Sequence, residues 1–256
     1  MSKSLCLVLT LLCLLAAVPI VGSAQQQEAP IFTFVAEWDV PRAQWADYTA
    51  FGEKNARPVQ DRLAADGTLM NWGNYATVVH EEKGITHGVW YTASSIAGIE
   101  KALGEFLKLP PNPASAGARH HDYLLRSLIH RGRATAASSA YLWVSITVLQ
   151  PAKGDQWREQ WEKYSKPTYD ELFGNGTITE YTVYVEHVHT ENPNVRYVVY
   201  VTPTAEGMDK VRAAFAALEQ KRSKEENRAI GAAFAEISVP GTHRDYFARV
   251  STYWHK

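Results

Sequence analysis

The sequence predicts an α+β protein made of two consecutive copies of one unit, each with a four-stranded antiparallel sheet, packed together as a barrel within one chain. Two observations carry this prediction. The segment 58–91 aligns with 167–200 without a gap when it is shifted by 109 positions. Over 31–109 against 140–218, 19 of 79 positions are identical, whereas average residue usage gives about five. Such a match indicates an internal duplication, which determines the architecture.

The first copy begins with a strand over 31–40, where aromatic or small apolar residues fill every second position. The aromatic residues of 45–51 are spaced three apart, which places them on one stripe of a helix. Pro58 interrupts this helix, because proline lacks the backbone N–H and clashes with the preceding turn. We therefore expect a second short helix over 58–64.

Two further strands, over 68–80 and 87–92, are rich in aromatic and β-branched residues and form a hairpin around the polar segment 81–86. A helix over 96–109 and a strand over 122–130 complete the copy. The order strand, helix, strand, strand, helix, strand is that of a ferredoxin-like unit.

The second copy repeats this order after a linker of small residues. The expected elements are the linker 131–139, a strand over 143–149, a helix over 155–173 interrupted at Pro167, a hairpin of 177–189 and 195–202, a helix from Met208, and a closing strand over 246–254.

The second copy also carries an insertion. From His120 onward the two copies match at an offset of 123 instead of 109, so 14 residues are added between Leu218 and His243. The charged run EQKRSKEEN at 219–227 lies in this insertion. We expect it to lengthen the second helix and to present a solvated face.

The first 24 residues have the layout of a cleaved secretory signal. Lys3 precedes an apolar run over 5–21, and small residues follow up to an expected cut after Ala24. The alternative is an uncleaved membrane anchor, since the run is close to the length that spans a bilayer. We expect a secreted or periplasmic protein with a signal peptide at 1–24 and repeats at 25–133 and 134–256.

Composition excludes several classes of function. Both cysteines, Cys6 and Cys13, lie in the leader, so the mature chain has neither disulfides nor thiolate metal sites. Its 25 basic and 27 acidic residues give a charge of −2, without the clustered basic excess of a nucleic-acid-binding protein. After the leader no segment is apolar enough to span a membrane, and we find no phosphate-binding loop, dinucleotide fingerprint or nucleophile elbow.

The duplicated element order resembles the dimeric α+β barrel superfamily in its tandem form, where one chain supplies both halves. That resemblance implies that the open faces of the two sheets pack against each other. The superfamily includes cofactor-independent monooxygenases, haem-binding and haem-degrading enzymes, chlorite dismutase-like proteins, muconolactone isomerase-like proteins and stress-response proteins. No diagnostic catalytic motif accompanies the resemblance, so no family residue is transferred to this chain.

Polar residues that occur in both copies are the candidates for catalysis. The second strand of each copy ends in a histidine, and another histidine precedes the last strand with an aspartate two residues on. Imidazoles transfer protons near neutral pH, and a nearby carboxylate holds their tautomer. The candidate catalytic residues are His80, His189, His120, His243, Asp122 and Asp245.

Aromatic and basic residues at equivalent positions are candidates for substrate binding. Trp72 and Tyr181 share the strand face of the first histidine pair, and the others follow the aspartates. The candidates are Trp72, Tyr181, Tyr123, Tyr246, Arg126 and Arg249. The alternative is that the fold itself requires these residues, with the aspartates as turn caps and the aromatics as core.

Metal ligands are incomplete in the sequence. His187 and His189 lie on one face of a strand, and His80 faces His87 across the first hairpin, but each pair lacks a third ligand. We therefore predict no cofactor, with a metal ion or a haem held by a single histidine as alternatives.

Three functions are compatible with these observations. The first is an exported, cofactor-independent oxygenase- or isomerase-like enzyme that acts on a small organic molecule. The second is a non-catalytic protein that binds a small ligand or haem, and the third is a structural protein without an active site. The expected partner is a small molecule, and the sequence carries no prediction of oligomeric state.

Overall fold

The computed structural model describes residues 29–79, 84–190 and 193–256. The expected signal peptide at 1–24 and the candidate His80 lie outside the described residues. Within them, no helix is both long and apolar enough to cross a membrane.

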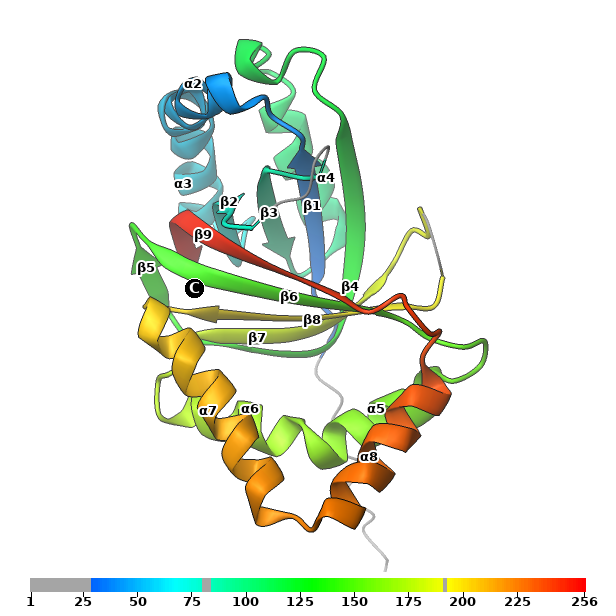
Figure 1. The fold of residues 1–256 in the computed structure, drawn as a ribbon. Helices are drawn as coiled ribbons and strands as arrows, with labels where there is room; N and C mark the ends of the chain where they lie inside the picture. The colour runs from blue at the N-terminus through cyan, green and yellow to red at the C-terminus, as the bar shows by residue number, and fades with distance from the viewer. Residues whose placement is uncertain (1–28, 80–83, 191–192) are drawn as a thin grey trace, which may run out of the picture.

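Eight antiparallel strands close into a barrel (Figure 1). They are β1 Phe32–Trp38, β2 Asn71–Thr77, β3 His87–Ala93, β4 His120–Gly132, β6 Ala140–Val148, β7 Glu180–Glu186, β8 Val195–Thr202 and β9 Arg244–His255. Their order is β2-β3-β1-β4-β7-β8-β6-β9, and pairing of β9 with β2 closes the ring. The two expected sheets therefore share both edges, through β4–β7 and β9–β2, which confirms the α+β barrel.

Alternation along the strands separates an inner from an outer apolar layer. Inside the barrel, Tyr75, Trp90, Leu142, Tyr197 and Tyr253 belong to one buried cluster. Two other clusters lie on the outer face, one under the helices of each half.

The helices of the first half cover the outer face of β1–β3 (Figure 1). They are the 3-10 turns η1 Arg42–Gln44 and η3 Pro113–Ser115, the π-helix η2 Gly52–Ala56, and α2 Trp45–Phe51, α3 Arg57–Ala65 and α4 Ile96–Phe106.

The expected interruption at Pro58 takes the form of a π-helix. Residues 45–65 follow one helical path through η2, and Pro58 occupies the first turn of α3. Inside a regular helix, proline loses one backbone hydrogen bond and its ring clashes with the carbonyl four residues before it, and the wider π-turn directly before Pro58 relieves this clash.

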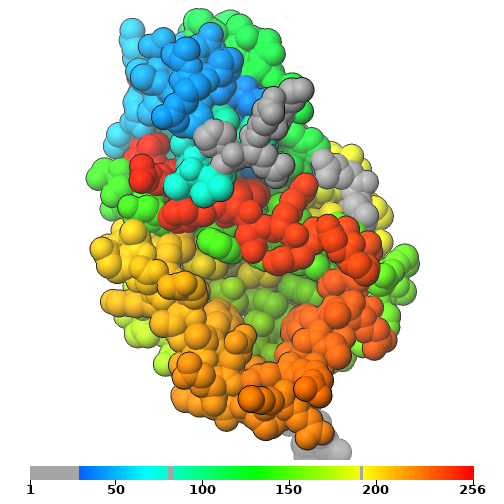
Figure 2. Space-filling view, in the orientation of Figure 1, coloured from blue at the N-terminus to red at the C-terminus, as the bar shows by residue number. Residues whose placement is uncertain are grey.

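The insertion of the second half forms a separate helix, which corrects the expected longer helix. The helices of this half are α5 Gly154–Tyr164, α6 Lys166–Gly174, α7 Ala205–Lys221 and α8 Lys224–Ile237. Ser223 ends α7 and starts α8, because its side chain accepts from Glu226 N at 3.1 Å while Glu226 accepts from Ser223 N at 2.7 Å. The two helices form a V that stands out from the barrel (Figures 1 and 2).

The segment 131–139, expected as a linker, is largely strand. β4 continues to Gly132, and a short strand β5, Thr135–Ala137, pairs with the end of β9. The small residues here allow close strand contact: a Cβ on Gly132 would lie 2.0 Å from His255 Nε2.

Candidate active site

A pocket of about 410 Å³ lies between the outer face of the sheet and the first-half helices. Its floor comes from β1, β3 and β4, where alternation turns Phe34, Ala36 and Trp38 outward. Its walls come from α2, η2, α4 and the segment 107–115.

Small side chains keep this space open. Ala36, Gly52, Ala56 and Ala76 line the pocket, and a Cβ built on Gly52 meets no atom within 4 Å. The π-helix therefore faces a hollow, and the pocket is roomy enough for a small organic molecule.

His87, the first residue of β3, reaches the pocket from a buried position. The residue is only 4% exposed, and its ring contacts Tyr48 with centroids 4.8 Å apart and the edge of Trp45 at 5.3 Å. Burial lowers the pKa of His87 to about 4, because the charged imidazolium is poorly solvated there. The side chain is consequently neutral at physiological pH.

Thr86 orients the His87 imidazole. Its Oγ1 lies 3.1 Å from His87 Nδ1 and 3.2 Å from the carbonyl oxygen of Trp38. The Trp38 carbonyl oxygen can only accept a hydrogen bond. The Thr86 hydroxyl that donates to it therefore accepts from His87 Nδ1–H. In that tautomer Nε2 of His87 carries a lone pair.

His120 and Asp122 form a second polar group at the exposed side of the pocket. Both side chains project from the same face of β4, and His120 Nε2 lies 3.4 Å from Asp122 Oδ2. The His120 ring is nearly parallel to the Trp38 ring, with centroids 6.3 Å apart. The carboxylate can therefore accept a hydrogen bond from the imidazole and fix its orientation.

Trp38 lies between the two histidines in the sheet. It pairs with His87 on β3 and with His120 on β4. Two strand spacings place the backbones of the histidines about 10 Å apart. The pocket thus presents a buried neutral imidazole and an exposed carboxylate-paired imidazole on either side of one indole.

The charge of the lining does not suit haem. Among the described residues the lining contains the carboxylates Glu53 and Asp122 but neither lysine nor arginine. Haem carries two carboxylates, which cationic side chains or solvent would have to balance. The pocket instead suits an uncharged ligand.

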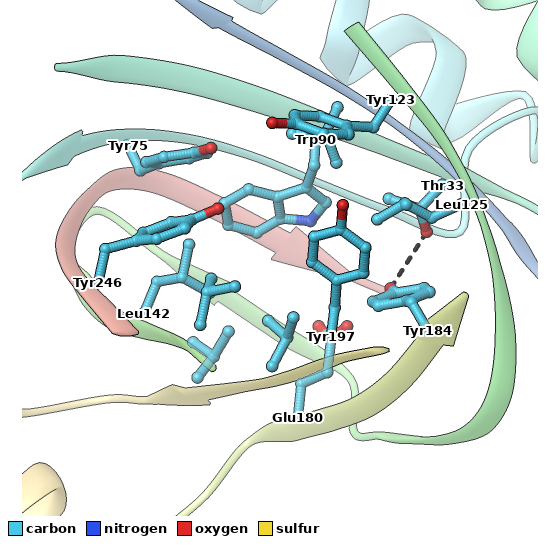
Figure 3. A pocket seen from close by; sticks show the side chains of 14 residues that line it. Thr33, Tyr75, Trp90, Tyr123, Leu125, Leu142, Glu180, Tyr184, Tyr197 and Tyr246 are labelled. Carbon is cyan, nitrogen blue, oxygen red and sulfur yellow. Dashed lines mark hydrogen bonds between the residues drawn. The ribbon is translucent and has the colours of Figure 1, made fainter. Parts of the chain in front are cut away.

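A second cavity, of about 50 Å³, lies inside the barrel (Figure 3). Tyr123 and Tyr246 line it together with Tyr75 and Trp90. Tyr75 and Tyr246 both donate to the buried Glu37, the latter at 3.0 Å, and desolvation raises the pKa of that carboxyl. The cavity has room only for a few water molecules.

The structure separates the residues that the sequence grouped. Asp122 lines the outer pocket, whereas its neighbour Tyr123 faces the barrel interior, because successive side chains of a strand point to opposite faces. His243 and Asp245 form the equivalent pair in the second half, with Nε2 and Oδ2 3.3 Å apart, but they do not line the pocket. His189 is exposed after the end of β7.

The remaining candidates for substrate binding also lie away from the pocket. Trp72 and Tyr181 are fully buried between sheet and helices, where Tyr181 donates to Asp170. Arg126 is half-buried on β4, and Arg249 is exposed on β9.

Sequence reasoning missed His87 and Tyr48 as pocket residues. His87 entered only as a possible metal ligand. A usable signal was present, since His87, Val89 and Tyr91 occupy alternate positions of one strand and therefore share a face.

The barrel is similar to those of solved proteins. One, described as a "putative monooxygenase" from Lactobacillus acidophilus, gives a TM-score of 0.61 at 11% identity, over 89% of this chain and 97% of the other. Another protein described in the same words, from Fusobacterium nucleatum, gives a TM-score of 0.61 at 9% identity, over 89% of this chain and 95% of the other. An anthrone oxidase-like protein gives a TM-score of 0.54 at 10% identity, over 88% of this chain and 92% of the other.

No family model and no curated protein sequence matches the chain. The structural likeness, at these identities, shows a shared α+β barrel fold. The reaction has to be argued from the pocket itself.

Proposed function

We propose that the chain is an enzyme that removes a proton from a small uncharged aromatic ketone or phenol and lets O₂ oxidise the resulting anion without a cofactor. The observation that carries the proposal is the pocket of about 410 Å³ with His87 and His120 on either side of Trp38.

The lining supports this class of substrate. Phe34, Trp38, Tyr91 and Phe106 offer flat apolar surfaces, and Asn74 and Asn112 add neutral polar groups. Aromatic walls with a few polar groups are typical of sites for flat, weakly polar ligands.

The two histidines suit different roles. Burial disfavours the imidazolium form of His87, so His87 is suited to hold a substrate hydroxyl or carbonyl by a hydrogen bond. The carboxylate of Asp122 lies 3.4 Å from His120 Nε2 and can hold the tautomer of this exposed imidazole, which is therefore suited to receive the proton and pass it to solvent.

The oxidation balances without an external reductant. A CH₂ group next to a carbonyl or aryl ring loses a proton to His120, and the carbanion gives electrons to O₂. One oxygen atom ends as the new carbonyl of the substrate and the other leaves as water with both hydrogens. The descriptions of the structural neighbours as monooxygenase and anthrone oxidase-like proteins support the same class.

Anthrone is a suitable probe, because its CH₂ is acidic and its product, anthraquinone, differs in absorbance. The purified protein should accelerate O₂ uptake, and His120→Ala and His87→Ala should each lower kcat/KM by about 10²–10⁴-fold. The matched control is His243→Ala, which removes the equivalent histidine of the second half outside the pocket. Equal loss in the control, with folding intact, would exclude this site.

A ligand-binding protein is the second candidate, favoured by the weak basicity of buried His87. Binding is measured by quenching of tryptophan fluorescence. The outcome that favours binding has two parts: saturable quenching that His87→Ala abolishes, and no O₂ uptake with any of a panel of aryl ketones and phenols. That outcome would replace the enzyme proposal by the ligand-binding one.

We also infer that the protein acts after export, on the strength of the leader at 1–24. Expression with the full leader should yield an extracytoplasmic protein whose first residue is Gln25. Recovery of the uncleaved chain in membranes would instead support an anchor.

A further inference from the structure

A cluster of two histidines and a glutamate lies at the end of the barrel where the chain terminates. His130 of β4, Glu180 of β7 and His255 of β9 each direct one nitrogen or oxygen into the same space, and these atoms lie within 4.8 Å of one another. We propose that the cluster binds one divalent first-row transition ion. Two imidazoles and one carboxylate are a ligand set that zinc and iron sites use.

Both imidazoles are held through Nδ1, and their Nε2 atoms face each other. His255 Nδ1 lies 2.8 Å from the main-chain oxygen of Lys256, which only accepts, so Nδ1 carries the proton and Nε2 a lone pair. His130 Nδ1 lies 2.9 Å from Thr182 Oγ1. Anchoring of the second ring nitrogen by an oxygen is the usual arrangement of histidines that bind metal.

The carboxylate is oriented in a similar way. Asn71 Nδ2 and the Tyr253 hydroxyl, the latter at 2.7 Å, both donate to Glu180 Oε2. The other oxygen, Oε1, lies 4.0 Å from His130 Nδ1, on the histidine side. Oε2 is thus fixed by two donors, while Oε1 lies on the side of His130 and accepts from Thr182 Oγ1 at 3.5 Å.

The separations are close to those of a bound ion. His130 Nε2 and His255 Nε2 are 3.3 Å apart, and two imidazole nitrogens on one tetrahedral ion, each at about 2.0–2.1 Å, lie about 3.3–3.4 Å apart. The imidazole rings are nearly parallel, at 17°, so they must tilt slightly to converge. The three ligand atoms lie within 4.8 Å of one another, so the carboxylate must move closer to the imidazoles to complete the set.

The surroundings hold the His255 ring and admit water. The Gly132 backbone packs closely against the His255 imidazole, since a Cβ at that position would lie 2.0 Å from Nε2. Glu180 also lines the cavity inside the barrel (Figure 3), so water from that cavity can fill an open coordination position. The His130 side chain is 17% exposed, which gives an ion a route from solvent.

The experiment uses untagged protein stripped with a chelator and titrated with Co²⁺, whose visible spectrum reports coordination, followed by displacement with Zn²⁺. We expect one ion per chain and a rise in melting temperature with metal concentration. His130→Ala, His255→Gln and Glu180→Gln should each weaken binding by more than about 100-fold. His243→Ala, which removes an exposed histidine beside a carboxylate, should leave binding unchanged.

Circular dichroism of each metal-free variant separates lost ligands from lost folding, and Glu180→Gln keeps an oxygen for Asn71 and Tyr253. Wild-type protein that binds neither Co²⁺ nor Zn²⁺ would overturn the proposal and leave a hydrogen-bonded cluster. Binding that persists in the folded His130→Ala and Glu180→Gln variants would overturn it as well, since the ion would then lie elsewhere.

Discussion

The outer faces of the two halves are covered by helices in the same order but are packed differently. At the offset of 109, Gly52 of the first half corresponds to Trp161, and Gln60 corresponds to Tyr169. Trp161 is 4% exposed and Tyr169 is 9% exposed, and their rings lie 5.6 Å apart in the apolar cluster under α5–α8. In the first half Gly52 lines an open pocket.

This difference indicates that the side-chain volume at a few positions decides where this fold has room for a ligand. The histidine and aspartate pair is present in both halves, at 3.4 Å in the first and 3.3 Å in the second. Only in the first half does this pair line a pocket that also contains a buried histidine. In the second half, Arg196 occupies the position equivalent to His87. Four measurements test this difference between the two halves.

The largest expected effect is on stability. Trp161→Ala should lower the free energy of unfolding by about 3–5 kcal/mol, because the indole fills the space that its counterpart Gly52 leaves open. Urea denaturation measures this loss. A loss below about 1 kcal/mol would mean that the second half is not tightly packed around Trp161.

The next effect concerns pH. The unfolded chain protonates His87 below its ordinary pKa of about 6.5, whereas the folded chain does so only below about 4. The unfolded state therefore binds more protons between these values, and stability falls as the pH falls from 6.5 to 4, by roughly 3 kcal/mol at most. His87→Gln should flatten this part of the profile, and exposed His243→Gln should not.

Filling the first-half pocket is the third measurement. Gly52→Trp should weaken ligand binding by about 100-fold, since it places in the first half the side chain that fills the second. Gly104→Trp is the matched control, because Gly104 is an exposed helical glycine, on α4, with no atom within 4 Å of a built Cβ. Unchanged binding by the folded Gly52→Trp variant would place the ligand elsewhere.

The smallest expected effect separates the two histidine and aspartate pairs. Asp122→Asn should lower kcat/KM about 10-fold, because an amide does not hold the tautomer and orientation of the His120 imidazole as the carboxylate does. Asp245→Asn, the same change in the second half, should leave kcat/KM within twofold. Equal effects of both changes would contradict the assignment to one pocket.

Much of the architecture could be predicted from local patterns. The alternation over 31–40 and the three-residue spacing of the aromatics in 45–51 predicted β1 and α2 within a few residues. The insertion was harder, because the charged run 219–227 is compatible with one long helix. Its division depends on the capping pair Ser223 and Glu226, which stops one helix and starts the next.

The candidate site was less predictable. His120 and Asp122 were found because the spacing recurs in both halves, but Tyr123 was grouped with them although it points into the barrel. The cluster of His130, Glu180 and His255 draws on strands that are far apart in the chain. Their proximity depends on the β4–β7 and β9–β2 pairings that close the barrel.

Local patterns predict the order of strands and helices and the α+β class, because hydrophobic periodicity and proline positions act within a few residues of the chain. Which polar groups meet depends on how the strands pack in three dimensions. Closure of the sheet and the volumes of Gly52 and Trp161 act across the fold, so the pocket beside His87 and the cluster at the end of the barrel emerge only when the strands are assembled.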